Sequence, residues 1–194
     1  MTAVLDLVDD ATPGLRERKK QRTRATLIDV AVRLCLERGY EHTTVDQIAA
    51  AAEVSPRTFS RYFATKDAVY LSLFEDLITA VAGELRLLAP EIPPLRALKD
   101  AHLAVLGRAA SGAAPGLSST GIALALQIVN ATEELRLAAG AIQSPLIVSA
   151  LADRMGVELA SRRVRLVMAV WSAIVVTGCT DLLADGEGAD RTAE

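Results

Sequence analysis

The sequence has little of what a β-sheet or a disulfide scaffold needs. Aromatic residues make up 4% of its 194 residues, and its two cysteines, Cys35 and Cys179, lie far apart without CxxC or Cys/His spacing. This argues against a disulfide framework and against a zinc site, and we expect both cysteines to be small core residues. Because strand-forming residues are scarce while 51% of the chain is apolar and alanine is abundant, the expected fold class is all-α.

Signals for a membrane or for export are also lacking. The uncharged stretch Leu166–Thr180 spans 15 residues, fewer than the roughly 20 that a helix needs to cross a bilayer. The first residues include Asp6, Asp9 and Asp10, and no basic segment followed by an apolar core precedes or follows them, as a secretory signal would require. We therefore expect a cytoplasmic protein with no membrane partner.

Positive charge is concentrated near the N-terminus. Residues 15–66 contain 11 Lys or Arg against 6 Asp or Glu, whereas residues 67–194 contain 10 against 15. The densest basic run is opposed locally only by Glu17 and consists of Arg16, Arg18, Lys19, Lys20, Arg22 and Arg24. Such a run attracts phosphate groups or an anionic membrane, although by itself it is more often a solvated helix end.

Two helix-start signals follow this run. Thr44, with Gln47 three residues later, forms a capping box, and Ser55 followed by Pro56 is an N-cap with a proline in the first turn. After a helix expected at 18–38, which Gly39 ends, the pattern predicts short helices at 45–52 and 56–63 joined by a three-residue turn. This spacing is typical of a DNA-binding helix-turn-helix.

The second short helix carries a face suited to reading bases. Phe59 and Phe63, four residues apart, form its inner side, which turns Arg57 and Arg61 outward. Arginine makes paired hydrogen bonds to guanine O6 and N7, so this face has the chemistry for sequence recognition. An ordinary amphipathic helix explains the arginines, but it does not explain their position after a capped turn and a basic arm.

A longer pattern runs through this region in four segments, Gly39–Ala49, Ala52–Ser55, Thr58–Phe63 and Lys66–Val69. With these segments, the chain from about Thr23 to Phe74 strongly resembles the TetR family of bacterial transcriptional regulators. The resemblance implies a three-helix DNA-binding domain at the N-terminus and an all-helical ligand-binding and dimerisation domain behind it. It also implies, in the usual case, repression that a small molecule relieves.

Carried over by position, the resemblance places DNA contacts on both short helices and just beyond them. The residues are Thr44, Ser55, Pro56, Arg57, Thr58, Ser60, Arg61, Tyr62 and Lys66. We add Arg22 and Arg24 from the basic run, and Thr43 beside the N-cap. Hydroxyls at helix N-termini suit phosphate, and a lysine supplies a flexible charge for the backbone. Tyr62 is equally suited to packing with its hydroxyl at the surface.

Two positions depart from the family pattern. Glu53 stands where the turn commonly has glycine, so either the turn geometry differs or Glu53 adopts a left-handed backbone at a cost of about 1 kcal/mol. Ser60 stands where the family often has a tyrosine used on DNA. The sequence preference is therefore expected to depend more on Arg57 and Arg61.

The rest of the chain is expected to form further helices, at 65–89, 95–110, 118–131, 133–155 and 161–183, with a break at 111–116. Pro145 is able to split the fourth of these. The last helix is apolar on nearly every side, so it must be buried on more than one face. We therefore expect, as the resemblance also implies, a homodimer in which the last two helices of each protomer form a four-helix interface. Such a dimer would bind double-stranded DNA at an inverted-repeat operator.

This pattern divides the chain into four parts. We expect a flexible tail at 1–15, a helix-turn-helix domain at 16–66, a helical effector-binding and dimerisation domain at 67–185 and a second flexible tail at 186–194.

The second domain shows no nucleophile motif, metal-ligand cluster or phosphate loop, so we expect no catalytic residue, metal or cofactor. A small-molecule effector remains expected, and the candidates for binding it are His102, Gln127, Asn130, Met168 and Trp171. Residues of this kind are more often satisfied core or surface positions than parts of a binding site. If they line a pocket, an apolar or aromatic effector is favoured, because few basic groups that could fix a phosphate lie between Lys99 and Arg154.

Three function classes follow from these patterns. The favoured one is a ligand-released repressor that is not an enzyme. A second keeps the DNA binding but makes the protein an activator or an effector-independent regulator. A third is a helical carrier or enzyme whose basic arm contacts an anionic surface, and for this one the sequence shows no catalytic constellation.

Overall fold

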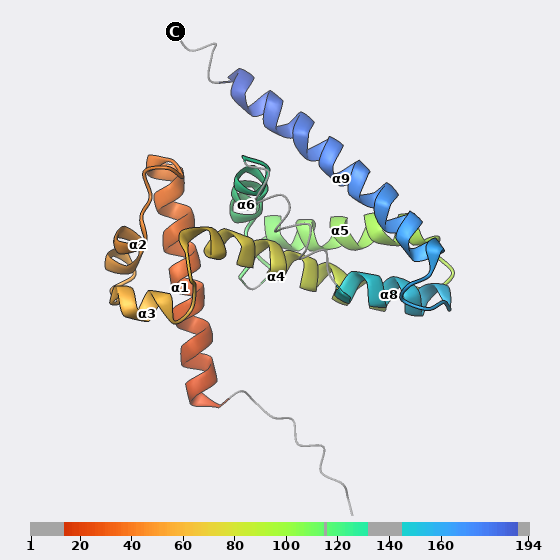
Figure 1. Cartoon of the computed structure of the whole chain (residues 1–194), viewed down its shortest axis with the longest axis horizontal. Helices are drawn as coiled ribbons and strands as arrows, with labels where there is room; N and C mark the ends of the chain where they lie inside the picture. The colour runs from red at the N-terminus through yellow and green to blue at the C-terminus, as the bar shows by residue number, and fades with distance from the viewer. Residues whose placement is uncertain (1–13, 115, 132–144, 190–194) are drawn as a thin grey trace, which may run out of the picture. The chain divides into compact units, whose positions relative to one another are not determined.

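A computed structural model describes residues 14–114, 116–131 and 145–189. All regular structure in these residues is helical, which confirms the all-α fold class (Figure 1). The helices are α1 (Leu15–Arg38), α2 (Val45–Ala51), α3 (Pro56–Ser60), α4 (Lys66–Leu87), α5 (Pro94–Ala110), α6 (Ser119–Ala131), α8 (Pro145–Met155) and α9 (Arg162–Ala189). The chain divides into two compact units, residues 1–64 and 65–194.

The first unit packs three helices around one small core. The buried residues of α1 include Leu27, Ala31 and Leu34, whose spacing of three and four residues gives the helix a single apolar face. Ile48 of α2 and Phe59 of α3 are fully buried as well. The predicted apolar stripe of the first helix is therefore confirmed, and so is the burial of Cys35.

The third helix is shorter than the pattern predicted. It ends at Ser60 because the backbone N–H groups of Arg61 and Tyr62 bond three residues back, to Thr58 and Phe59, which tightens the last turn. Phe63 still bonds four residues back, to Phe59, and its ring lies 5.8 Å from the Phe59 ring. Both rings therefore stay on the inner side although the helix itself has ended.

The second unit is built around α4. This helix contacts α5, α6 and α8, while α9 contacts α5 and α8. Fully buried apolar residues at the centre of this packing include Val81, Leu98, Val105 and Leu151. Thr65 caps the start of α4, since its Oγ1 accepts the backbone N–H of Ala68 at 3.2 Å.

Arg154 of α8 ties the end of α4 to the start of α5. Its guanidinium donates to the carbonyl oxygens of Leu88 at 3.1 Å and Ile92 at 3.1 and 3.2 Å, and also to those of Leu85 and Ala89. Leu85 and Leu88 lie at the C-terminus of α4, where carbonyl groups lack helical partners and a cation complements the helix dipole, while Ala89 and Ile92 lie in the connection to α5. One side chain thus fixes three elements together.

The end of the chain differs from the sequence expectation. The helix expected at 133–155 is described only from Pro145 onward, and residues 132–144 lie outside the described part. The last helix was expected to stop at residue 183, with a tail from 186, but α9 continues to Ala189. Glycine costs only about 1 kcal/mol inside a helix, so Gly186 and Gly188 do not end it.

Candidate nucleic-acid interface

The recognition helix α3 exposes the side that faces away from its buried phenylalanine. Phe59 has no exposed surface, whereas Arg57, Ser60 and Arg61 are exposed. With Thr58, these three residues line a shallow surface hollow of about 430 Å³. The structure therefore brings the four central residues of the predicted reading face together on one surface.

Hydroxyl groups hold the first turns of both short helices. Thr44 Oγ1 accepts the backbone N–H of Gln47 at 3.3 Å, and the Gln47 side chain accepts the N–H of Thr44 at 3.0 Å, which confirms the capping box. Ser55 Oγ accepts the N–H of Thr58 at 3.1 Å. In the capping box Thr44 Oγ1 acts only as an acceptor. The proton of this hydroxyl group can therefore still be donated to a phosphate at the N-terminus of α2.

The turn between α2 and α3 contains a strained residue. Glu53 has φ of 55°, and it is the one non-glycine residue with positive φ in the described part of the chain. Two alternatives were expected for Glu53, a different turn geometry or a left-handed backbone. The structure shows the left-handed backbone. It keeps the usual turn geometry at a local cost of about 1–2 kcal/mol.

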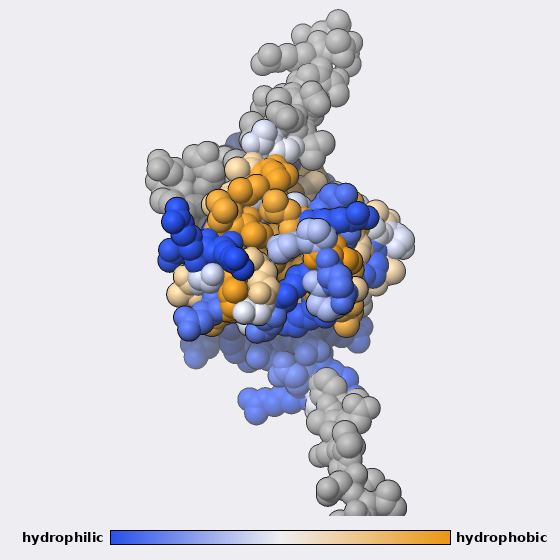
Figure 2. Space-filling view, turned by 90° about the vertical axis from the view of Figure 1, so that its right-hand side faces the viewer, coloured by the Kyte–Doolittle hydropathy of each residue, from blue (hydrophilic) through white to orange (hydrophobic). Residues whose placement is uncertain are grey.

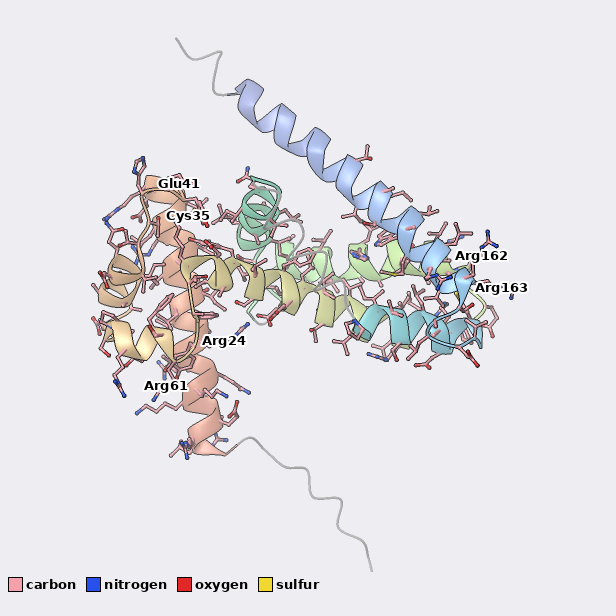
Figure 3. The ribbon with its side chains drawn as sticks, viewed as in Figure 1. Arg24, Cys35, Glu41, Arg61, Arg162 and Arg163 are labelled. Atoms are coloured by element: carbon pink, nitrogen blue, oxygen red, sulfur yellow. The ribbon has the colours of Figure 1, made fainter. Side chains whose placement is uncertain are left out.

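Two arginines of the first unit lie over aromatic rings. The Arg24 guanidinium lies 5.9 Å from the centroid of the Phe63 ring, and that of Arg61 lies 5.3 Å from the centroid of the Tyr62 ring. Figure 3 labels Arg24 on α1 and Arg61 at the end of α3. Arg24 is partly buried, so it packs α1 against the end of α3 besides bringing charge to this surface.

Thr43 does not belong to the exposed face. It is 1% exposed, and its hydroxyl donates to the carbonyl oxygen of Gly39 at 2.9 Å. The prediction that Thr43 contacts DNA is therefore wrong, because the buried side chain closes the turn before α2 and is not available to DNA. Its neighbour Thr44 is exposed.

The basic run of α1 lines two neighbouring hollows that share Lys19 and Thr23. Arg16, Lys19, Lys20 and Thr23 line a hollow of about 760 Å³ together with Gly14, Glu17, Arg61 and Tyr62. Arg18 and Arg22 line a second hollow of about 580 Å³ on the side of Ala52 and Val54, and Lys19 and Thr23 line this hollow as well. From the sequence the run was expected to act as one cluster, and only Arg22 and Arg24 were expected to contact DNA. Helical spacing places residues 16, 19, 20 and 23 along one side of α1, and Arg18 and Arg22 lie next to that side.

Among the candidates for effector binding, His102 and Trp171 lie together. The His102 ring on α5 lies 4.8 Å from the Trp171 ring on α9, at an interplanar angle of 50°. His102 Nδ1 lies 2.7 Å from the carbonyl oxygen of Leu98. Because a carbonyl can only accept, Nδ1 carries the proton of the neutral ring, which leaves Nε2 as an acceptor. Burial lowers the pKa of His102 below its ordinary value of 6.5, against the opposing effect of the Leu98 bond.

Of the other effector candidates, Met168 lies one helical turn before Trp171 on α9, whereas Gln127 and Asn130 belong to α6. Met168 is partly buried and packs against the core of the second unit, as Trp171 does. Gln127 is exposed on α6, so it lies outside the core of the protomer. Asn130 belongs to α6, but its side chain is outside the described part.

The described residues contain neither a candidate metal site nor a candidate membrane span. No group of three or more His, Cys, Asp or Glu side chains there is placed to hold a metal ion. No described helix combines the length and the apolar character that crossing a bilayer requires.

Comparison with known proteins decides the family. The family model described as bacterial regulatory proteins, tetR family, matches residues 27–73. The transcriptional regulator TcmR of Streptomyces glaucescens is 39% identical over 166 residues, which cover 84% of this chain and 74% of TcmR. The chain belongs to the TetR family of bacterial regulatory proteins. It is accordingly a DNA-binding transcriptional regulator, as its exposed helix-turn-helix indicates.

Two further proteins are similar to this chain. The transcriptional repressor DhaR of a Mycobacterium species is 32% identical over 87 residues, or 43% of each chain. The solved structure of the fatty acid degradation regulator FadR from Bacillus halodurans superposes with a TM-score of 0.55 at 21% identity, covering 90% of this chain and 88% of that one. This second likeness shows the fold.

The TetR family match leaves one part of the first unit outside it. The matched segment begins at Leu27, whereas α1 begins at Leu15. The half of α1 that carries the basic run therefore precedes the segment that the family model matches.

Proposed function

We propose that this protein is a homodimeric repressor that binds an inverted-repeat operator and is released from it by a small apolar or aromatic molecule. The observation that carries the DNA-binding part is the exposed face of α3, with Arg57 beside Thr58 and Ser60 above a fully buried Phe59. The name repressor is supported by the relative DhaR, which is described as one. A regulator of this kind acts on DNA in the cytoplasm, without catalysis, metal or cofactor.

Within this proposal the side chains that contact DNA divide into two roles. Arg57 reads base edges in the major groove, together with Thr58 and Ser60, because arginine pairs with guanine O6 and N7. Thr44, Ser55 and Pro56, at helix N-termini, and Lys66, at the start of α4, position the protein on phosphates. Arg22, Arg24 and Tyr62 add to the backbone contacts.

The homodimer is supported by an exposed apolar stripe on α9. Leu166 is 64% exposed, Val170 38% and Ile174 51%, and their spacing of four residues places them on one side of the helix. Figure 2 shows apolar surface exposed at the end of the second unit that carries α8 and α9. Burying such side chains contributes about 1.5–3 kcal/mol each, which favours a second copy of the same two helices as the partner.

The effector part of the proposal is supported by His102 and Trp171. An indole ring beside a neutral imidazole with a free acceptor nitrogen suits an aromatic molecule that carries a hydroxyl or N–H donor. The effector acts only as far as it binds the DNA-released state better than the DNA-bound one, and a difference of a few kcal/mol is enough.

The test is DNA binding by fluorescence anisotropy over a salt series. The purified protein is mixed with the duplex upstream of its own gene or with a scrambled duplex of equal length. Preferential binding by two protomers per site is the expected result. Equal binding to both duplexes contradicts an operator at that position, and no binding at low salt favours the carrier reading. A compound library added to the bound complex then identifies effectors by loss of anisotropy.

A transcription assay on the same operator distinguishes a repressor from an activator, and the effector screen identifies an effector-independent regulator. Transcription from the operator in a reconstituted system falls on addition of a repressor and rises on addition of an activator. A protein whose operator complex no compound releases is an effector-independent regulator.

A further inference from the structure

The hollow beside α1 is lined mainly by cationic side chains. Arg16, Lys19 and Lys20 come from one face of α1, and Arg61 comes from the end of α3. All four side chains are exposed, and Glu17 is the one acidic residue in the lining. A concave surface with this excess of positive charge concentrates anions more strongly than a flat surface does.

Arg61 joins this hollow to the reading face of α3. It lines the hollow of about 760 Å³ with the α1 residues and also the hollow of about 430 Å³ with Arg57. The two hollows therefore meet at one guanidinium. Cationic side chains therefore extend from the exposed face of α3 through Arg61 to α1, and an arrangement of this length fits an extended polyanion better than a single small anion.

Tyr62 restrains the side chain of Arg61. The guanidinium lies over the Tyr62 ring, and its Nη2 lies 3.5 Å from the phenol oxygen. Stacking of this kind limits the rotamers of the arginine side chain. It also leaves the remaining N–H groups of the guanidinium available to other acceptors. Arg61 is thus held at the boundary of the two hollows, whereas Arg57 lies in the reading face alone.

We propose that this cleft, formed by Arg16, Lys19, Lys20, Arg61 and Tyr62, binds the phosphates of the DNA strand that flanks the base pairs read by α3. The inference rests on the proposed mode of DNA binding and deepens it. It assigns Arg61 to the backbone instead of to a base, and it adds three residues that precede the TetR family match. These contacts strengthen binding to every sequence and lengthen the segment of duplex that each protomer covers.

The experiment uses the full-length protein with Lys19 and Lys20 both replaced by alanine. The probes are an operator duplex selected from a random pool by the wild-type protein and a random duplex of equal length. Each lost phosphate contact lowers the slope of log K against log salt by about 0.9 and the affinity at 0.1 M salt by about tenfold. We expect a slope change of about 1.8 per protomer, equal on both duplexes. Ethylation of the phosphates that flank the half-site is expected to interfere with wild-type binding and not with binding of the variant.

Two matched variants separate a contact from an indirect effect. Arg33→Ala removes one charge from the same helix, where Arg33 pairs with Glu37 at 3.5 Å, and it is expected to leave the slope unchanged. Replacing both lysines by arginine keeps the charge and is expected to retain the wild-type slope. A Lys19→Ala/Lys20→Ala protein with the wild-type slope and interference pattern overturns the proposal, and so does a loss on the operator alone. A wild-type protein that does not prefer its selected operator instead overturns the proposed function.

Discussion

Ser55 Oγ lies 3.0 Å from Thr58 Oγ1 while it also accepts the Thr58 backbone N–H at 3.1 Å. The side chain therefore organises the first turn of α3, a helix of only five residues that has little intrinsic tendency to form. Any contact of Ser55 with DNA comes in addition to this structural role.

Ser55→Ala is expected to destabilise the first unit by about 1 kcal/mol, since an N-cap is lost. For a unit of this size the loss corresponds to a fall in Tm of about 4–8 °C, measured by circular dichroism. Ser60→Ala is the control, because Ser60 is exposed on the same helix and caps nothing. Equal Tm values for the two variants would contradict the capping role.

Glu53→Gly is expected to stabilise the protein by about 1 kcal/mol, because glycine adopts the observed positive φ without a Cβ clash. Thermal unfolding measures the gain. Glu53→Ala removes the same carboxylate but keeps the Cβ, so it should bring no comparable gain. If alanine stabilises as much as glycine, the benefit comes from charge and not from the backbone.

Arg57→Ala is expected to lose about 1–3 kcal/mol of operator binding and to relax the choice of base at its position. Lys66→Ala is the contrast, because loss of a phosphate contact weakens all sequences alike and lowers the salt slope by about 1. Anisotropy titrations on operator and random duplexes check both variants. Equal losses on the two duplexes for Arg57→Ala are incompatible with base reading.

Leu166→Glu is expected to shift the protein from dimer to monomer, because it places a charge in the apolar stripe of α9. Light scattering after size exclusion measures the mass over a range of concentrations. Leu87→Glu is the matched control, since Leu87 is also an exposed leucine but lies on α4. A Leu166→Glu protein that remains dimeric would place the interface elsewhere.

The stability of the second unit is expected to fall as the pH drops below 6.5. Because the pKa of His102 is lowered in the folded protein, the unfolded chain binds a proton in this range that the native state does not. The contribution of neutral His102 to the free energy of unfolding is therefore complete above pH 6.5 and is lost at lower pH. Trp171 is the single tryptophan, so its fluorescence reports unfolding beside His102. His102→Gln should reduce this pH dependence, and an unchanged profile in the variant would assign it to other groups.

The first unit could be predicted closely because its signals are local. The capping box at Thr44, the Ser55–Pro56 start and the Phe59–Phe63 pair each act within four residues, and all three are present in the structure. The sequence could not show which of the expected DNA-binding side chains instead bond or pack within the protein. Thr43 is closed into a turn, and Arg24 packs on Phe63, and both depend on how the helices meet.

The second unit was harder to predict because its interactions join distant residues. The helix bounds of α5 and α6 were predicted to within one residue by proline, glycine and serine signals. Arg154, which reaches carbonyl groups more than 60 residues earlier in the chain, carried no local signal at all. The dimer interface and the effector site stay predictions for the same reason, since each depends on groups brought together by packing.

The clamp made by Arg154 also determines how α4 can move. The end of this helix near Leu88 is bonded to Arg154 of α8, so a change in the direction of α4 that keeps these bonds displaces the helix less near Leu88 than near Lys66. A helix of 22 residues is about 33 Å long, and a rotation of about 5° about one end displaces the other by about 3 Å. A small rearrangement among the packed helices of the second unit is thereby amplified at the residue where the DNA-binding unit is attached.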